Sequence, residues 1–269
     1  MVHDLSKTNS DGFSWASVNR TSIVTQDITD GAVVVYPNNI IVGPSRNWTS
    51  KDQDYSLRFR YPAGEAMAEQ RFTLGAPRNE LWIRYWIRVP VNFSFESGGT
   101  PNKFFSIWFD GYEGAGDGST VWLCMEKFNT NSASLWFTYT IGNYTGSTAP
   151  KQTTPFIDVP ADRERWMQIV FHVKAESSPG AGDGIIETYR RWDGDTSFSK
   201  LHEMLNAPLK IATAGPNGFS AGYIMGWANA AYSTDTEWLL DDFTISDTSL
   251  LDVVIAPNAP TRVRVISSE

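Results

Sequence analysis

The chain lacks several features that mark common classes of protein. It has a single cysteine, Cys124, so no internal disulfide can form. It contains no run of about 18 consecutive apolar residues and no apolar leader at its N-terminus, so neither a membrane span nor an export signal is visible. No long window repeats apolar residues at helical spacing, which argues against a helical domain.

Positive charge is also scarce. Lys and Arg total 22 against 30 Asp and Glu, which gives a formal charge of −8. This acidic balance repels polyanions at long range and argues against nucleic acid as a partner. A local arginine cluster can still bind an anionic polysaccharide, because salt screens the distant acidic surface.

Aromatic residues, glycine and proline are abundant instead. The sequence contains 11 Trp, 10 Tyr and 15 Phe, together with 21 Gly and 14 Pro. Aromatic and β-branched runs separated by Gly, Pro, Asn and Ser clusters are typical of short strands joined by turns. About a dozen such runs follow one another every 8 to 15 residues or so, which predicts an all-β, two-sheet antiparallel β-sandwich of the jelly-roll type.

The strands form one continuous series. Because no linker divides them into two self-sufficient halves, we expect a single jelly-roll domain over residues 1–250. Residues 251–269, which contain Pro257 and Pro260, are expected to form a C-terminal arm or linker. The best candidate for a short helix is the segment from Phe198 to Leu205.

The stretch from Leu81 to Val89, LWIRYWIRV, alternates most clearly. Its odd-numbered residues are apolar, and its even-numbered residues are Trp82, Arg84, Trp86 and Arg88. One face of this strand should therefore pack in a core while the other presents indoles and guanidiniums. Such a face suits a glycan, because sugars stack on indoles and arginine holds carboxylates with two hydrogen bonds. The competing interpretation is that a loop or second layer covers the indoles.

Four runs between Arg58 and Ser246 carry a family resemblance: LWIRYWIRV, NKFFSIWF, RWMQIVFHVKAESSPGAGDGIIETYRRWDG and EWLLDDFTIS. Together they resemble concanavalin-A-like jelly rolls of the polysaccharide-lyase-like group, which includes heparin lyase I, alginate lyase and glucuronan lyase. The resemblance implies that one sheet is bent into a concave groove for an extended glycan. Lyases of this group cleave the glycan by β-elimination at a uronic acid.

That reaction needs a group to neutralise the carboxylate, a base for the C5 proton and an acid for the leaving oxygen. The residues that the sequence offers for catalysis are Arg84, Gln168, His172 and Tyr223. Trp86, Arg88, Trp108 and Trp227 are the candidate carbohydrate-binding residues. A structural role for His172 stays open, because similar jelly rolls carry such a histidine on the convex sheet. Other lyases of this fold use a Tyr, Lys and Arg set, whose motifs do not align securely with this chain.

Carboxylates arranged for glycoside hydrolysis are not apparent. Glu126 and Glu187 are each solitary on their strands, and Asp241 and Asp242 should point to opposite faces. No cofactor is required for the expected chemistry. The resemblance implies that Asp241 or Asp242 helps to bind a structural Ca²⁺, an ion that prefers oxygen ligands.

We therefore expect a carbohydrate-binding jelly-roll protein and, if it is an enzyme, a polysaccharide lyase. The alternative is a non-catalytic protein: a lectin module, an adhesin or a viral structural protein that decorates the virion surface. The expected partner is a polysaccharide, anionic in the lyase interpretation, with a homo-oligomer or particle contact through the C-terminal arm. We expect a soluble protein that acts outside the cell or on a virion surface.

Overall fold

The computed structural model describes residues 12–25, 34–35, 39–40, 51, 55–94, 102–112, 119–127, 129–140, 146–148, 155–209, 218–251 and 265–266. Within these residues the regular secondary structure is β-strand, and no α-helix occurs. The all-β prediction is therefore confirmed. In the same residues we find no helix long and apolar enough to span a membrane.

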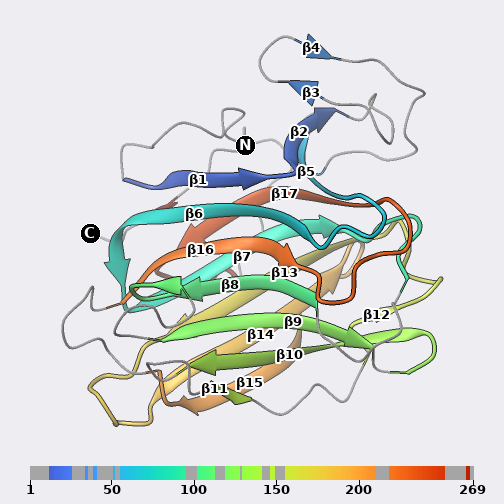
Figure 1. The fold of residues 1–269 in the computed structure, drawn as a ribbon. Coiled ribbons are helices and arrows are strands. Elements are labelled where there is room, and N and C mark those ends of the chain that lie inside the picture. Colours follow the sequence, from blue (N-terminus) through green and yellow to red (C-terminus); the bar gives the residue numbers. More distant parts are fainter. Residues whose placement is uncertain are drawn as a thin grey trace.

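Two eight-stranded sheets form the two layers of a sandwich (Figure 1). Sheet A contains, in spatial order, β1 (Ser14–Asn19), β6 (Met67–Arg78), β16 (Phe219–Trp227), β8 (Asn102–Trp108), β9 (Thr120–Lys127), β10 (Ser132–Thr140) and β11 (Gly146–Thr148). A short strand, β12 (Ile157–Asp158), also pairs with β10. All pairings in this sheet are antiparallel, as predicted for a jelly roll.

Sheet B lies behind sheet A in Figure 1. It contains, in spatial order, β15 (Ser199–Ala207), β14 (Gly184–Trp192), β13 (Trp166–Lys174), β7 (Glu80–Arg88), β17 (Thr236–Ser246), β5 (Tyr55–Tyr61) and β2 (Thr21–Thr25). From the predicted C-terminal arm, β18 (Val265–Ile266) pairs with β17 in parallel. A separate two-stranded sheet joins β3 (Val34–Val35) to β4 (Asn39–Ile40).

The chain changes sheets between its first two strands. β1 is the edge strand of sheet A and β2 is the edge strand of sheet B, and only Arg20 separates them. Arg20 adopts a left-handed φ of 52°, and its carbonyl accepts a hydrogen bond from the Arg60 amide at 3.0 Å. A single short segment thus supplies the edge strands of both sheets on the same side of the sandwich.

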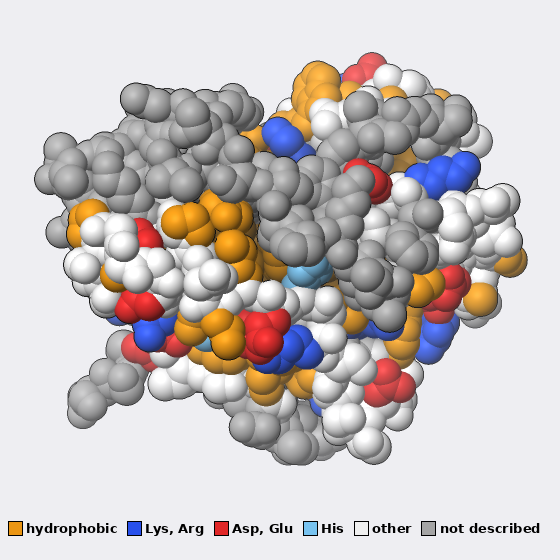
Figure 2. All heavy atoms as spheres, turned by 90° about the horizontal axis from the view of Figure 1, so that it is seen from below, with side chains coloured by type: hydrophobic (Ala, Val, Ile, Leu, Met, Phe, Trp, Pro, Cys, Tyr) orange, Lys and Arg blue, Asp and Glu red, His pale blue; other side chains and the backbone are white. Residues whose placement is uncertain are grey.

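The predicted helix from Phe198 to Leu205 is wrong, because this segment forms β15 at the edge of sheet B. Leu201 and Met204 both pack against the core, and their three-residue spacing imitates a helix. A register shift opposite Thr188 and Tyr189 inserts an extra residue, which brings both side chains to the same face. Figure 2 looks onto this edge of the sandwich and shows hydrophobic side chains among charged ones at its surface.

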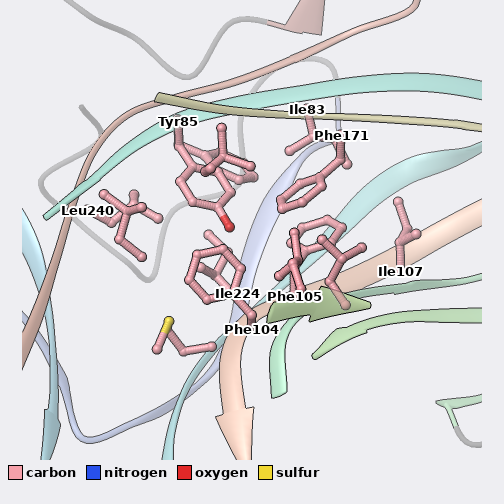
Figure 3. Close-up of a cluster of buried hydrophobic side chains, with 14 of the residues drawn as sticks. Ile83, Tyr85, Phe104, Phe105, Ile107, Phe171, Ile224 and Leu240 are labelled. Carbon is pink, nitrogen blue, oxygen red and sulfur yellow. The ribbon is translucent and has the colours of Figure 1, made fainter. Parts of the chain in front are cut away.

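The core between the sheets is built from alternating positions, as the sequence predicted. The odd-numbered residues of β7 are at most 2% exposed, and they face the inward side chains of sheet A. Phe105 from β8 stacks on Phe171 from β13 with ring centroids 4.6 Å apart (Figure 3). The Tyr85 hydroxyl is directed into this cluster, and it has no hydrogen-bond partner among the residues that the structure describes.

Candidate functional site

The even-numbered face of β7 is covered rather than open. Trp82 is 9% exposed and stacks on the His172 ring, with centroids 3.9 Å apart. Leu250, which follows β17, packs over the same indole together with Tyr189. The predicted open stripe is therefore wrong at Trp82, because a segment after the last long strand folds back over it.

The two arginines of this face are also enclosed. Arg84 is 1% exposed, donates a hydrogen bond to the Leu250 carbonyl at 3.3 Å and lies 3.9 Å from the Asp242 carboxylate. Arg88 is 8% exposed and donates from Nε to the Glu164 carbonyl at 3.0 Å. Both guanidiniums therefore hold neighbouring segments against sheet B, and neither lines an open surface.

Trp86 is half-buried between two cations. The Lys51 ammonium lies 5.1 Å from its ring centroid, and the Arg191 guanidinium lies 5.6 Å away. The Arg191 Nε also donates to the Gln168 amide oxygen at 2.8 Å, and Gln168 itself is 2% exposed. The competing interpretation from the sequence, with cations packed along covered indoles, describes this face of sheet B.

His172 is held between two carboxylates. Its Nδ1 lies 2.7 Å from a Glu187 oxygen, and its Nε2 lies 2.8 Å from a Glu80 oxygen. Burial would raise the pKa of Glu187, but hydrogen bonds from Lys200 and His172 outweigh it and lower this pKa below its usual value. His172 is 4% exposed, whereas the Glu80 and Lys200 side chains of the same network are 38% and 40% exposed, so the network links a buried imidazole to the surface on the outer side of sheet B.

The four predicted catalytic residues do not meet. Arg84, Gln168 and His172 belong to strands of sheet B, whereas Tyr223 belongs to β16 in sheet A. Stacked sheets lie about 10 Å apart and these side chains point away from the interior, so they cannot act on one bond. Trp108 lies on the same outer face as Tyr223, with ring centroids 5.9 Å apart.

Asp241 and Asp242 both lie on the outer side of sheet B, so their expected placement on opposite faces is wrong. A bulge between Asp241 and Thr244, with Asp242 at a left-handed φ of 48°, breaks the alternation. The Asp241 carboxylate accepts from the backbone amides of Lys51 at 2.8 Å and Asp242 at 2.9 Å, and from the Ser56 hydroxyl at 3.3 Å. This carboxylate thus holds two backbone amides and a hydroxyl, and a structural Ca²⁺ at Asp241 or Asp242 stays a prediction. No group of three His, Cys, Asp or Glu side chains suited to a metal occurs in the described residues.

The outer face of sheet A, which points away from sheet B, carries a different cluster. Register places Arg71, Tyr223, Ser106 and Trp122 in one row across β6, β16, β8 and β9. Tyr112, just beyond β8, lies over this row. We use the name sheet A cluster for Glu69, Arg71, Lys103, Tyr112 and Tyr223.

Tyr112 is the centre of the sheet A cluster. Its hydroxyl oxygen accepts hydrogen bonds from the Lys103 ammonium at 2.9 Å and from the Trp122 indole at 3.4 Å. It also lies 3.2 Å from the Tyr223 hydroxyl. Because the two other donors occupy its lone pairs, Tyr112 donates its own proton to Tyr223. Tyr112 and Lys103 are both half-buried, so they reach the surface of this face.

Arg71 brings a second cation to the cluster. Its guanidinium lies 5.1 Å from the Tyr112 ring centroid and 5.7 Å from that of Trp108. Burial alone would lower the pKa of Arg71, but the hydrogen bond from its Nε to Glu69 at 2.5 Å contributes to a net increase. The Arg71 side chain is 32% exposed while Glu69 is 6% exposed. A buried carboxylate therefore holds a charged guanidinium at the surface.

Tyr223 supports the cluster from beneath. It is fully buried, and burial, followed by the influence of Tyr112, raises its pKa well above the usual value, so the phenol is neutral. Gly226 leaves room for its ring, because a Cβ at that position would lie 2.9 Å from the ring edge. Burial likewise raises the pKa of the Cys124 thiol to about 12, in keeping with its expected role in packing.

Sequence reasoning missed Arg71, Lys103 and Tyr112 as site residues. Arg71 was visible as the charged position opposite the apolar side of its strand. Lys103 has the opposite parity to Trp108, and only the register shift between Lys103 and Phe105 brings them to one face. Tyr112 begins a glycine-rich stretch that has no periodicity, so no pattern could place it.

Known structures with the same architecture identify the fold. An alginate lyase, Aly36B, in complex with an alginate trisaccharide matches with a TM-score of 0.51 and 10% identity, over 70% of this chain and 80% of that chain. The fold is a concanavalin-A-like jelly roll. This confirms the fold that the sequence resemblance implied.

Further structures match more loosely. The alginate lyase vAL-1 from a Chlorella virus has a TM-score of 0.48 and 11% identity, over 71% of this chain and 84% of that chain. The exoplasmic/lumenal domain of VIP36, in a Ca²⁺/Man2-bound form, has a TM-score of 0.39 and 10% identity, over 82% and 80% of the two chains. No family model and no curated protein sequence matches the chain.

Proposed function

We propose that this protein binds an anionic polysaccharide on the outer face of sheet A, through Arg71, Lys103 and Tyr112. The observation that carries the proposal is the pairing of two partly exposed cations with a phenol above a bed of buried aromatic rings. Arginine and lysine hold carboxylates by charge-assisted hydrogen bonds, and aromatic rings stack on sugar C–H faces. Against a net charge of −8, this local positive charge favours a uronate-containing chain.

Cleavage by β-elimination is the chemistry that we propose for these groups. Arg71 would neutralise the uronate carboxylate. The Tyr112 oxygen would take the C5 proton and return it to the glycosidic oxygen that leaves C4, so that the C4–O bond breaks as the C4=C5 double bond forms, while Lys103 offsets negative charge on the Tyr112 oxygen. Tyr223 is too deeply buried to touch a sugar, so it acts as a positioning residue for Tyr112. The fold shared with an alginate lyase supports polyuronates as the first substrates to test.

A single assay tests both parts of this proposal. The protein is incubated with alginate, glucuronan and heparin, and the ultraviolet absorbance of unsaturated uronates is followed alongside direct binding. Arg71→Ala should weaken binding and turnover at least about tenfold, because it removes a charge-assisted contact worth about 1.5–3 kcal/mol. Arg71→Lys should recover part of the binding.

The control is Arg191→Ala, which removes an arginine stacked on Trp86 on the opposite sheet. It should leave binding and turnover unchanged. If Arg191→Ala abolishes binding while Arg71→Ala does not, the ligand lies on sheet B and the proposed site is wrong.

A non-catalytic glycan-binding protein is the second candidate. The observation that favours it is the Tyr112 oxygen, which already contacts Lys103, Trp122 and Tyr223 and is thereby held in place. Binding to polyuronates without any absorbance change would establish this candidate. It includes a lectin module, an adhesin, or a virion-surface protein that contacts a second copy or a particle through residues 251–269.

A further inference from the structure

Trp227, at the end of β16, carries an exposed indole. It is 50% exposed, whereas the other tryptophans with described side chains are buried or half-buried. No ring stacking or cation contact within the described residues involves it. An exposed indole offers a flat apolar surface on which the C–H face of a sugar ring can stack.

The backbone around Trp227 is fixed on both sides. The Ala228 amide donates to the Ala66 carbonyl at 2.7 Å, and the Asn102 side chain exchanges hydrogen bonds with Ala230 at 3.0 and 3.2 Å. The Tyr61 hydroxyl donates to the Gly226 carbonyl at 2.8 Å. A rigid backbone presents the exposed ring at low entropic cost, which suits a binding contact.

Trp227 lies on the same side of sheet A as the sheet A cluster. It is paired with Met67, which has the same parity in β6 as Arg71. Its neighbour Ala228 lies in the core, so Trp227 points away from the core even though Met225, at a left-handed φ of 62°, interrupts the alternation of β16. Tyr223 is paired with Arg71, so four residues separate the two positions on each strand. At the rise of a β-strand this is ~13 Å, longer than one sugar ring.

We propose that Trp227 is a distal stacking platform for the polysaccharide that the sheet A cluster binds. The inference rests on the proposed function and adds that the ligand is a chain of several sugars. One uronate pairs with Arg71, and a ring further along the chain lies on the Trp227 indole. Short oligosaccharides held at Arg71 do not reach Trp227.

The test compares alginate oligosaccharides of two lengths, a disaccharide and a mixture of long oligomers, by isothermal titration calorimetry. Trp227→Ala should reduce affinity for the long oligomers about threefold to tenfold and leave disaccharide affinity unchanged. Trp227→Phe should retain most of the affinity. The control is Leu205→Ala, which removes a 56% exposed side chain from the far edge of sheet B and should change neither affinity.

The outcomes separate the two proposals. If Arg71→Ala weakens both ligands but Trp227→Ala weakens neither, the cluster binds glycan and the role of Trp227 is wrong. The same conclusion follows if Trp227→Ala weakens both lengths equally. If the unmodified protein binds alginate oligomers of neither length and binds no glucuronan or heparin oligomers, both the proposed function and this inference are wrong.

Discussion

At the scale of single residues, the same side-chain types serve different purposes on the two faces. Arg71 on sheet A is 32% exposed, whereas Arg84 on sheet B is 1% exposed. Both lie near a carboxylate, which is Glu69 for Arg71 and Asp242 for Arg84. The identity of a residue therefore predicts which contacts it can make, and only the surrounding chain decides whether a ligand can reach it.

Tyr85 gives a prediction about stability. Within the described part of the chain its buried hydroxyl lacks a hydrogen-bond partner, a situation that costs about 1–3 kcal/mol. Tyr85→Phe should therefore raise the free energy of unfolding by about 1 kcal/mol, measured by urea denaturation. The matched control is Tyr61→Phe, which removes a hydroxyl bonded to the carbonyls of Ala68 and Gly226 and should destabilise the protein. A loss of stability in Tyr85→Phe would contradict the prediction.

Glu187 gives a prediction about pH. Because its pKa is lowered in the folded protein, its carboxylate contributes stability at neutral pH that is lost as the pH falls below about 4.5. Glu187→Gln should remove part of this dependence, so its melting temperature should fall less steeply on acidification. The control is Glu203→Gln, which changes an exposed partner of Lys200. Its melting temperature should fall on acidification as steeply as that of the unmodified protein. If the melting temperatures of all three proteins fall equally steeply on acidification, the role of Glu187 is wrong.

At the scale of elements, the regular strands were predictable and their irregularities were not. The alternation in β7 and β13 identified their inward faces correctly. Bulges in β8 and β17 moved Lys103 and Asp242 to faces that simple alternation does not give, and the shift beside β15 imitated a helix. A bulge depends on the partner strand, so a single strand's sequence does not reveal it.

β16 gives a prediction about such an irregularity. Gly226 has a φ of +125°, and a Cβ there would lie 2.9 Å from the Tyr223 ring. Gly226→Ala should displace the ring, break its contact with Tyr112 and weaken polyuronate binding as well as stability. The control is Gly194→Ala, where φ is +95° but a Cβ meets nothing within 4 Å. Backbone strain alone should cost that variant about 1 kcal/mol without affecting binding. Equal binding by both variants would refute the role of Gly226.

At the scale of the whole molecule, the two outer faces of the sandwich are used differently. On sheet B, Leu250 packs over Trp82 and its carbonyl accepts from Arg84. On sheet A, Lys103, Tyr112 and Arg71 remain partly exposed. The sequence predicted the sandwich and an aromatic, cationic face on β7, and the structure shows that Leu250 and Tyr189 pack against the Trp82 indole on that face. The segments that cover a sheet face are distant from its strands in the chain, so the local sequence pattern of a strand does not show whether it will be covered.

Leu250 tests the importance of this covering. It is 2% exposed and contacts the cluster of Trp82, Val170 and Tyr189. Leu250→Ala should lower the free energy of unfolding by about 2–3 kcal/mol, measured by urea denaturation, because it opens a cavity over sheet B. The exposed Leu205→Ala should cost less than about 0.5 kcal/mol. Near-equal losses would mean that the segment after β17 does not seal this face.

The chain passes from sheet A to sheet B at Arg20, so one short segment supplies an edge strand to each sheet, β1 and β2. A chain that lost residues 12–25 would uncover the free backbone groups of β6 and β5 together. Unpaired margins of this kind recruit strands from other molecules. Because β1 and β2 are shorter than the β6 and β5 strands that they cover, loss of this single segment would expose longer edges to such pairing.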